Sequence, residues 1–321
     1  MRAKNDLLTI AVVVHDDLYG LRRLLRSLSR SFARGPAFPV LIIDNGSVRE
    51  PVTEVIQNEF PTLSIRIVRR TRNSMCEARQ NALEIASSEW ICFIDADCRV
   101  LPRWSSVVSE KLKALSEVHD LAAWGAPALN RGRSLEAEIS RWLGRFFPGH
   151  HAVSEPQTIF HLPSSHLFLH RERTLKAGGF IPGFHRAGED MVLSYTLQRA
   201  GFKTRLLPEP RVFHAQKPGL KRFLSRLERY GRVHGKLVWL YPEHLLGRRF
   251  FPLLILLFWL GLTVQQPLGG LTLLLFSLSF WIYWSPVSGG LRRKLIAWFY
   301  VAGALMSYAW GSICGLALRR S

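Results

Sequence analysis

Cysteine is scarce in this chain of 321 residues, and the positions of the few that occur argue against two kinds of site. The four cysteines are Cys76, Cys92, Cys98 and Cys314, and no two of them form a CxxC pair. Cys92 lies within an apolar run that predicts a strand, and Cys314 lies within a long apolar segment. The pattern argues against a zinc site and against a disulfide framework, and it favours a reducing compartment.

Acidic residues are also few, because 24 Asp and Glu stand against 43 Lys and Arg and give a formal net charge of +19. From Lys203 onward basic residues greatly outnumber acidic ones, and they border long apolar segments. A nucleic-acid binder is one interpretation of such a balance. The apolar neighbours favour another, an anionic lipid surface, so we expect a membrane and no nucleic acid as partner.

No secretory cleavage site follows the apolar segment near the start of the chain. Basic residues precede Leu7–Val14, as they do in a signal peptide, but His15-Asp16-Asp17 stands where small residues would be required. A first β-strand is therefore the better interpretation of this segment.

The first 125 residues alternate strand and helix patterns, which predicts an α/β fold with a doubly wound, mostly parallel sheet. Each predicted strand is a short apolar run, and the helices carry apolar residues at helical spacing. The predicted strands are Leu7–Val14, Pro39–Ile43, Leu63–Val68 and the run ending at Asp95, and the predicted helices are Leu18–Phe32, Val52–Phe60 and Ser74–Ala86.

The pattern from Leu121 to about Leu207 is mixed. It predicts helices at Ser134–Phe147 and Met191–Ala200, short strands at Phe202–Leu207 and Arg211–His214, and an apolar stretch, Thr158–Leu169, that Pro163-Ser164-Ser165-His166 interrupts. We expect the α/β domain to occupy residues 1–218.

A basic amphipathic helix, Gly219–Leu240, follows this domain. Such a helix commonly lies in a membrane interface, and an ordinary surface helix packed on the domain is the alternative. We expect this interfacial region to occupy residues 219–249 and a membrane region to occupy residues 250–321.

Three apolar segments, at about 250–266, 268–285 and 295–318, make up the membrane region. A full span needs roughly 20 residues, so the third segment qualifies, and the first two form either a spanning hairpin or a re-entrant pair. A buried pair of core helices is the alternative. Arg248-Arg249 and Arg292-Arg293-Lys294 flank the hairpin. The positive-inside rule therefore places both flanks and the α/β domain on the cytoplasmic side of the inner membrane.

Two carboxylates, Asp95 and Asp97, end the apolar run Ile91–Ile94. Ligands of open α/β sheets bind beyond the carboxyl ends of the strands. Two hard oxygen ligands there suit Mg²⁺ or Mn²⁺ holding a substrate phosphate, and a strand followed by an Asp-rich turn is the alternative. Asp44 and Asp16 follow neighbouring predicted strands. The sequence thus indicates a site for a nucleotide and its metal at this edge.

Four further side chains carry candidate roles. Arg79 is a cation that would offset diphosphate charge, or else a solvated helix residue. Glu189 and Asp190 follow a glycine and open a predicted helix. They either cap that helix or present a carboxylate that accepts a proton from an attacking hydroxyl. His214 ends a short strand, where a neutral imidazole either completes a metal shell or is polar surface.

Six short motifs in one order carry a resemblance. They are Asp44-Asn45-Gly46-Ser47, Ala78-Arg79-Gln80-Asn81-Ala82, Phe93-Ile94-Asp95-Ala96-Asp97, Gly178-Gly179-Phe180, Gly188-Glu189-Asp190 and Val212-Phe213-His214. Each is weak alone, but together the chain from about residue 7 to residue 235 resembles a family 2 glycosyltransferase of the GT-A fold.

The resemblance implies a role at the donor for several residues. Asp44 would hydrogen-bond the nucleotide base, Asp16 would assist at the nucleotide, and Asp95 would lie at the ribose. The first strand departs from the family pattern, because Val14-His15-Asp16-Asp17 stands where a Pro-containing segment is usual. The details of base recognition therefore do not carry over.

The resemblance also implies how the reaction proceeds. Asp97 would bind the divalent metal, assisted by His214, and Asp190, with Glu189 beside it, would be the catalytic base. The implied donor is a nucleoside-diphosphate sugar.

Processive synthases of this family carry Gln-x-x-Arg-Trp after the base, and this chain has no such motif there. The similar segment Glu138–Trp142 precedes the base and begins with Glu. We therefore expect a membrane-anchored, inverting, non-processive transferase that adds one sugar to a hydroxyl acceptor, with a lipid-linked acceptor in cell-envelope glycan or glycolipid synthesis favoured. A polyprenyl-phosphate glycosyl synthase is the alternative enzyme, and a non-catalytic scaffold that binds a sugar nucleotide is the alternative of another class.

Overall fold

The computed structural model describes residues 7–130, 132, 134–144, 157–158, 161–184, 187–215, 219–241, 251–285 and 287–317. The chain forms two compact units. The first comprises Met1–Arg131 and Gly144–Gln216, and the second comprises Gly132–Leu143 and Lys217–Ser321. The expected helix end at 145–147, the segment 242–249 with its arginine pair, and Leu318 lie outside the described residues.

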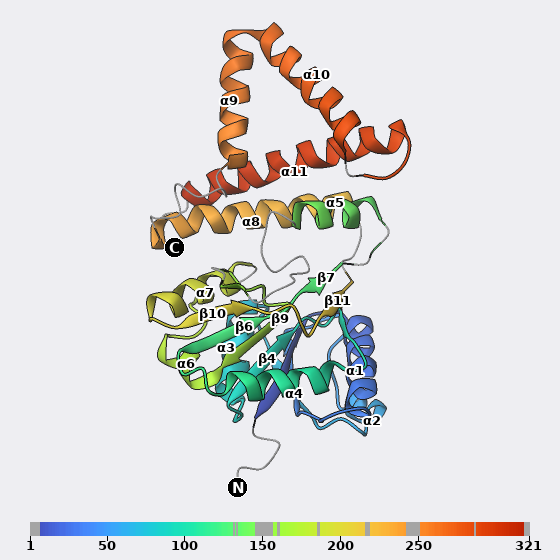
Figure 1. The fold of residues 1–321 in the computed structure, drawn as a ribbon, viewed down its shortest axis with the longest axis vertical. Helices are drawn as coiled ribbons and strands as arrows, with labels where there is room; N and C mark the ends of the chain where they lie inside the picture. Colours follow the sequence, from blue (N-terminus) through green and yellow to red (C-terminus); the bar gives the residue numbers. More distant parts are fainter. Residues whose placement is uncertain are drawn as a thin grey trace. The chain divides into compact units, whose positions relative to one another are not determined.

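The first unit is built on an eight-stranded sheet with strand order β3-β2-β1-β4-β9-β6-β10-β8 (Figure 1). The strands are β1 (Leu8–Val14), β2 (Val40–Asn45), β3 (Ile65–Arg70), β4 (Trp90–Ile94), β6 (Leu121–Gly125), β8 (Gln157–Thr158), β9 (His166–His170) and β10 (Lys203–Leu206). The first four pair in parallel, which confirms the doubly wound, mostly parallel sheet. Strands β1, β2 and β4 are buried along their whole length, which explains their continuous apolar runs.

Strand β9 departs from the parallel pattern and was not predicted. It runs antiparallel to both β4 and β6, in the centre of the sheet. Its side chains are all buried, and the ring of Phe168 stacks on that of Trp124. Because β9 begins where β4 ends, with His166 paired to Ile94, the loop before β9 lies at the edge that carries Asp95.

Helices cover both faces of this sheet. One face packs against α1 (Leu18–Phe32), α2 (Val55–Glu59) and α4 (Trp104–Leu115), and the other packs against α3 (Met75–Ile85) and α7 (Glu189–Arg199). The short helix α6 (Arg171–Lys176) follows β9. Leu21, Leu24, Leu25 and Leu28 supply the apolar stripe of α1 at helical spacing, and all are fully buried. Helices α1, α2, α3 and α7 lie at the predicted positions, although α2 is shorter than the expected Val52–Phe60.

A second, three-stranded sheet in the first unit has the order β5-β11-β7. Its strands are β5 (Cys98–Val100), β11 (Val212–His214) and β7 (Ala128–Leu129). Strand β11 runs antiparallel to β5 and pairs His214 with Cys98. This pairing brings a residue more than a hundred positions away to the end of β4.

The second unit is helical in its described part. It contains α5 (Leu135–Gly144) except for its last residue, α8 (Leu220–Leu240), α9 (Phe251–Gln265), α10 (Pro267–Trp284) and α11 (Leu291–Ala317). The third apolar helix begins at Leu291, earlier than the expected 295, so the basic cluster Arg292–Lys294 lies in its first turn. Two of these helices, α10 and α11, are long and apolar enough to cross a membrane, and α9 is shorter.

Candidate active site

The end of β4 and the start of β5 form a tight turn that presents two carboxylates. Strand β4 ends at Ile94, and the N–H of Cys98 donates to the carbonyl oxygen of Asp95 over 2.9 Å. About a third of the Asp95 side chain and a quarter of the Asp97 side chain are exposed. Both predicted acidic residues therefore emerge where the buried strand ends.

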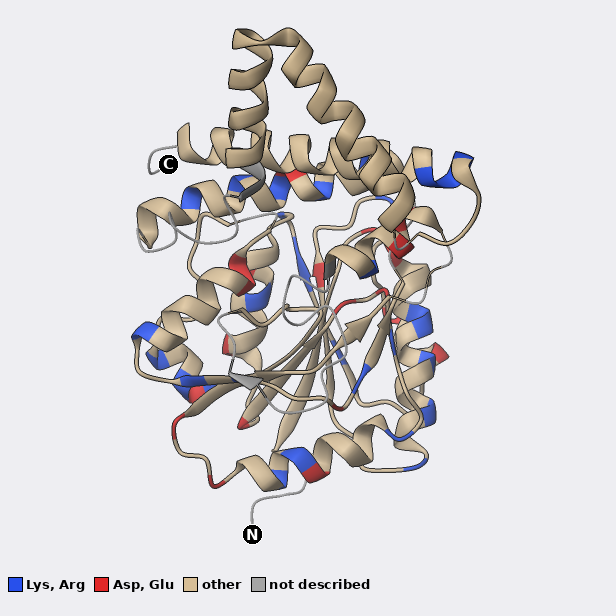
Figure 2. Cartoon of the chain, turned by 45° about the horizontal axis from the view of Figure 1, so that its top comes forward, with Lys and Arg blue, Asp and Glu red and all other residues tan. Residues whose placement is uncertain are grey.

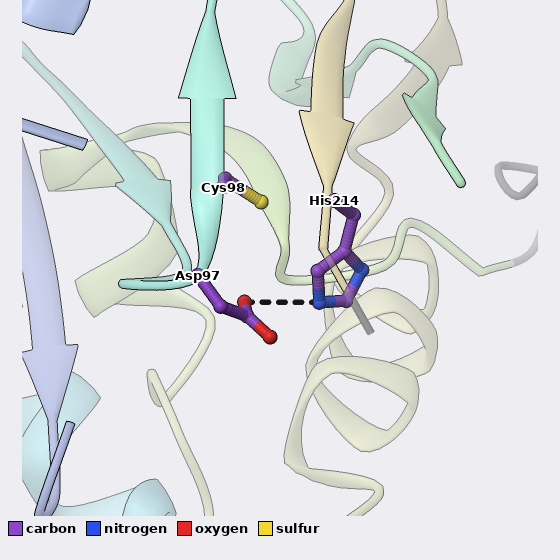
Figure 3. A group of neighbouring side chains, drawn as sticks. All are labelled: Asp97, Cys98 and His214. Carbon is purple, nitrogen blue, oxygen red and sulfur yellow. Dashed lines mark ion pairs between the residues drawn. The ribbon is translucent and has the colours of Figure 1, made fainter. Parts of the chain in front are cut away.

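His214 lies against this turn because β11 pairs with β5. Its Nε2 lies 3.0 Å from Asp97 Oδ1 and 4.0 Å from Asp95 Oδ2. Figure 3 shows the imidazole and the Asp97 carboxylate facing each other, with the thiol of Cys98 beside them. The structure thus brings together the two residues that the sequence assigned to a metal.

Asp97, Cys98 and His214 form the one group of potential metal ligands among the described residues, with ligand atoms within 4.8 Å of one another. The thiol is the weakest ligand of the three, because burial raises its pKa well above the ordinary value and the two neighbouring carboxylates raise it further. A carboxylate and an imidazole suit a divalent cation that keeps other positions for substrate oxygens. The donor set therefore fits Mg²⁺ or Mn²⁺ through Asp97 and His214.

Arg79 connects the two acidic motifs of the site. It lies on α3, and its side chain is almost completely buried. One terminal nitrogen lies 3.2 Å from Asp95 Oδ1, and the other donates to Glu189 Oε1. The guanidinium is therefore shared by two carboxylates, and its predicted action on a diphosphate stays a prediction.

Helix α7 begins with Glu189 and Asp190, whose surroundings differ. Gly188 precedes them with φ +87°, a backbone conformation that favours glycine. Glu189 is buried against Arg79, so its charge is compensated inside the protein. Asp190 accepts the Ser164 N–H over 2.9 Å at Oδ2 and keeps part of its surface exposed. Of the two carboxylates, Asp190 is the more exposed, with 16% of its side chain exposed against 5% for Glu189.

The carboxylate of Asp190 is held in its charged form. Burial works to raise its pKa, but the neighbouring His161, Arg79 and the Ser164 N–H outweigh burial and hold the pKa below the ordinary value. Asp95 shows the opposite balance, because burial raises its pKa against the opposing effect of Arg79 and His214. Asp190 is consequently in its charged form at neutral pH, the form that can accept a hydrogen bond from a hydroxyl.

His161 was missed by sequence reasoning, which found no signal in it. Its Nε2 lies 3.5 Å from Asp190 Oδ1, and its side chain is mostly buried. The position follows from the unpredicted strand β9, because the loop before that strand carries both His161 and Ser164 toward the start of α7. His161 could be identified as a site residue only once the antiparallel placement of β9 was known.

Asp44 and Asp16 brace the loop that follows β2. Asp44 is fully buried and accepts the N–H groups of Ser47 and Val52 over 2.9 and 3.0 Å. Asp16 accepts the N–H groups of Val48, Arg49 and Glu50. The Glu50 N–H, followed by the other contacts of this loop, lowers the pKa of Asp16 to about 2 despite some desolvation. Their expected contacts with a nucleotide stay predictions beside this structural role.

The profile of glycosyl transferase family 2 matches residues 9–173, which is more than half of the chain. The chain belongs to this family. The matched region includes the motifs at Asp44, Arg79 and Asp95–Asp97, and it ends before α7 and β11.

Curated relatives of this family member are distant. The pre-mycofactocin glycosyltransferase of Mycobacterium tuberculosis is 25% identical over 272 residues, which cover 82% of this chain and 54% of the relative. The glycosyltransferase SunS of Bacillus subtilis is 29% identical over 90 residues, which cover 28% of this chain and 20% of the relative. The chain therefore spans between a fifth and about half of the length of these relatives.

Solved structures of glycosyltransferases share the fold. The mannosyltransferase PcManGT from Pyrobaculum calidifontis, solved with GDP-Man and Mn²⁺, superposes with a TM-score of 0.63 at 17% identity, covering 96% of this chain and 88% of that one. GalNAc-T7, solved with UDP, GalNAc and Mn²⁺, gives a TM-score of 0.51 at 16% identity over 75% of this chain and 51% of that one. The GT-A-type fold expected from the sequence is confirmed.

Proposed function

We propose that this protein is a membrane-anchored inverting glycosyltransferase that moves one sugar from a nucleoside-diphosphate sugar to a hydroxyl acceptor. The observation that carries the proposal is the geometry at the end of β4, where Asp97 lies 3.0 Å from His214 and Arg79 joins Asp95 to the start of α7, which carries Asp190. Arg79 and Glu189 connect the two halves of this arrangement. Membership of the family and the shared fold support this assignment.

The proposed reaction is a single displacement at the anomeric carbon. The acceptor oxygen forms a bond to that carbon while the bond to the diphosphate oxygen breaks, and the diphosphate leaves with the electron pair. Asp190 takes the proton of the acceptor hydroxyl. Attack opposite the leaving group inverts the configuration. Glu189 is unsuited to the proton transfer because its carboxylate is buried against Arg79.

Asp97 and His214 are the residues that would hold a divalent metal, Mg²⁺ or Mn²⁺. Bound there, the cation would offset the negative charge that builds on the departing diphosphate. Two solved structures of similar fold were obtained with Mn²⁺ and with a nucleotide or a nucleotide sugar, which supports the same class of donor here.

The acceptor is proposed to be a lipid or a lipid-linked glycan at the inner membrane, with the catalytic domain in the cytoplasm and a role in the cell envelope. The support is the apolar surface of α9 and α10, where residues such as Phe258 and Phe276 are about two-thirds exposed. No charged residue occurs between Phe251 and Leu291. An enzyme and an acceptor that are both attached to the membrane diffuse in the same plane, which favours their encounter.

The transfer is proposed to be non-processive. The segment Glu138–Trp142, which resembles the motif of processive enzymes, lies on α5 in the second unit. Glu138 accepts hydrogen bonds from Ser288 and Arg293, and Trp142 packs edge-on against Trp281. These side chains hold helices together, which supports a structural role for the segment.

The test is nucleotide release by purified membranes given a panel of sugar nucleotides, with Mn²⁺, with Mg²⁺ and with chelator. We expect one donor to be consumed only with metal, and Asp97→Ala and Asp190→Asn to lose at least about a hundredfold in turnover. Asp120→Asn, at an exposed ion pair with Lys203, is the matched control. Full activity of Asp190→Asn would overturn the base assignment and indicate a phosphate acceptor, and donor binding without turnover would indicate a scaffold.

A further inference from the structure

Helices α8 and α11 pack side by side along most of their length and run in the same direction. Near one end the ring of Phe223 lies 6.0 Å from that of Tyr300. Near the other end the indole N–H of Trp239 donates to the carbonyl oxygen of Leu316 over 2.9 Å. These two contacts are 16 residues apart on both helices, so the pair stays together over roughly 24 Å at 1.5 Å per residue.

Glycines let the two backbones approach closely. A Cβ atom added at Gly231 or Gly235 of α8 would collide with the backbone of α11, and one added at Gly311 or Gly315 would collide with the backbone of α8. Close backbone contact of this kind leaves no room for one helix to slide or turn away from the other. The two helices therefore take the same orientation in any membrane.

The two helices differ sharply in charge. Helix α8 carries seven charged residues, Lys221, Arg222, Arg226, Glu228, Arg229, Arg232 and Lys236, whereas α11 carries none from Ile296 to Ala317. Figure 2 shows blue segments along α8 and only tan on most of α11. If α11 crossed the bilayer, α8 would enter the hydrocarbon with it. Placing one Lys or Arg side chain at the centre of the bilayer costs on the order of 3 kcal/mol. Burial of the apolar face of α11 does not offset that cost for the six basic residues of α8.

The surface of α11 away from α8 is apolar and exposed. Phe299, Met306 and Trp310 are each between 57 and 67% exposed, and Ile296 and Ile313 are about two-fifths exposed. A pair with charges on one helix and an uncharged apolar face on the other matches a membrane interface, with headgroups at α8 and acyl chains at α11.

The hairpin of α9 and α10 meets opposite ends of α11. Leu256 of α9 packs on the cluster of Val238 and Ala309 together with Leu316, near the end of α11. The indole N–H of Trp281 on α10 donates to the carbonyl oxygen of Lys294, near the beginning of α11. In Figure 1 the two hairpin helices converge away from α11, which runs across their open end. Because α11 lies crosswise, it cannot stand upright in a bilayer that the hairpin enters upright.

We propose that α11 lies in the plane of the membrane with α8 and does not cross it. The occupant of its outer face is the acyl region of the cytoplasmic leaflet, and the hairpin α9–α10 enters the bilayer from this layer. The inference rests on the membrane attachment proposed above, and it replaces the expected third span. The basic clusters on both sides of the apolar part of α11, Arg292–Lys294 and Arg319-Arg320, agree with both ends lying on the cytoplasmic side.

The test places a reporter after Ser321 of the full chain in a bacterial host. In-plane α11 predicts a fluorescent cytoplasmic reporter and an inactive periplasmic phosphatase. As a control, one strongly apolar spanning helix inserted before each reporter must invert both signals. An active phosphatase without that added helix would overturn the proposal.

A second readout does not depend on fusions. Arg229→Cys on the exposed side of α8 and Ser321→Cys are labelled with a maleimide that does not cross membranes. Both positions should react in inverted vesicles and neither in intact spheroplasts. Labelling of position 321 alone in spheroplasts would contradict in-plane α11. Sedimentation after a carbonate wash tests membrane attachment separately. A protein released into the supernatant would refute that attachment even though its reporter signals would match those of in-plane α11.

Discussion

Asp190 and His161 are the pair of side chains from which the chemistry at the residue scale follows. The imidazole nitrogen lies 3.5 Å from the carboxylate and contributes to its lowered pKa. His161 lies beside Asp190, the proposed base, so we regard it as a positioning residue. Its removal tests that role separately from the base itself.

We predict that His161→Gln lowers kcat about tenfold and leaves KM for the donor within about twofold. Without the imidazole, the pKa of Asp190 rises toward its ordinary value, because a neighbour that favoured the charged form is lost. The acidic limb of the pH–rate profile therefore moves to higher pH. The exposed His119→Gln is the matched control. An unchanged acidic limb in His161→Gln would show that the pair does not act on the base.

Arg79 makes the second prediction at this scale. It is buried between Asp95 and Glu189, so Arg79→Met leaves two carboxylates without their cation inside the protein. Losing one partner of a buried ion pair costs roughly 3–5 kcal/mol. We expect a fall in the thermal unfolding midpoint of several degrees or more, measured by intrinsic fluorescence in detergent.

Two further variants test whether the lost ion pair causes the destabilisation of Arg79→Met. The exposed Arg66→Met should leave the unfolding midpoint within a degree of the parent protein. The double change Arg79→Met with Glu189→Gln should recover part of the loss, since one of the stranded charges is gone. Additive losses in the double variant would refute the ion pair as the cause.

The sequence indicated several residues of this site but not their partners. Asp95 and Asp97 lie in the turn between β4 and β5, and His214 ends β11, so local patterns with a family resemblance are enough to select them. The contact of Arg79 with Glu189 joins positions 110 residues apart, and nothing local encodes it. The same holds for His161, because its position beside Asp190 depends on β9, a central strand that neither hydrophobic alternation nor strand propensity predicted.

Strand β9 shows at the element scale why the sheet was only partly predictable. Its five residues are apolar or histidine, and a proline and two serines precede them, which is typical of a loop. Strands β1, β2 and β4 are predictable because each is a clear apolar run, and helical patterns separate the first four strands from one another. The antiparallel strand β9 follows no such spacing of strand and helix. Its place depends on hydrogen bonds to both β4 and β6, which the local sequence does not reveal.

Close packing of α8 on α11 gives the prediction at this scale. Gly311→Val forces side-chain atoms against the Glu228 carbonyl, so the helices must separate. Overpacking of this kind costs about 1–3 kcal/mol. We expect a lower midpoint of thermal unfolding and faster proteolysis of the second unit.

Gly261→Ala on α9 is the matched control for Gly311→Val. A Cβ atom there meets nothing within 4 Å, and alanine favours a helix by up to about 1 kcal/mol over glycine. This variant should be as stable as the parent protein or slightly more so. Equal stability of Gly311→Val and Gly261→Ala would refute close packing of α8 on α11.

The second unit gives the prediction at the scale of the whole molecule, because its apolar surface is the part of the protein proposed to enter the membrane. Phe258 and Phe276 lie on the two hairpin helices and are 67 and 66% exposed. An aspartate costs on the order of 3 kcal/mol within a bilayer. We predict that Phe258→Asp with Phe276→Asp moves a large share of the protein from carbonate-washed membranes into the supernatant, measured by sedimentation and immunoblotting.

Tyr19→Asp is the control for the hairpin variant. Tyr19 belongs to the first unit and is 70% exposed, so its replacement adds one aspartate, half the charge of the hairpin variant, at a comparably exposed aromatic position. It should leave the protein in the membrane fraction. Retention of the hairpin double variant would show that α9 and α10 do not enter the bilayer.

Helix α5 affects how a catalytic fragment of the protein can be made, because most of it belongs to the second unit while the chain on both sides of it belongs to the first. The chain leaves the first unit at Arg131, forms most of α5 within the second unit and returns at Gly144. Ile139 is fully buried there in a cluster with Phe223, Val287 and Ala297. A fragment cut after Gln216 would therefore keep a helix whose apolar side has lost its partners. A soluble catalytic fragment requires two edits, one at that cut and one that replaces residues 132–143 with a short polar linker.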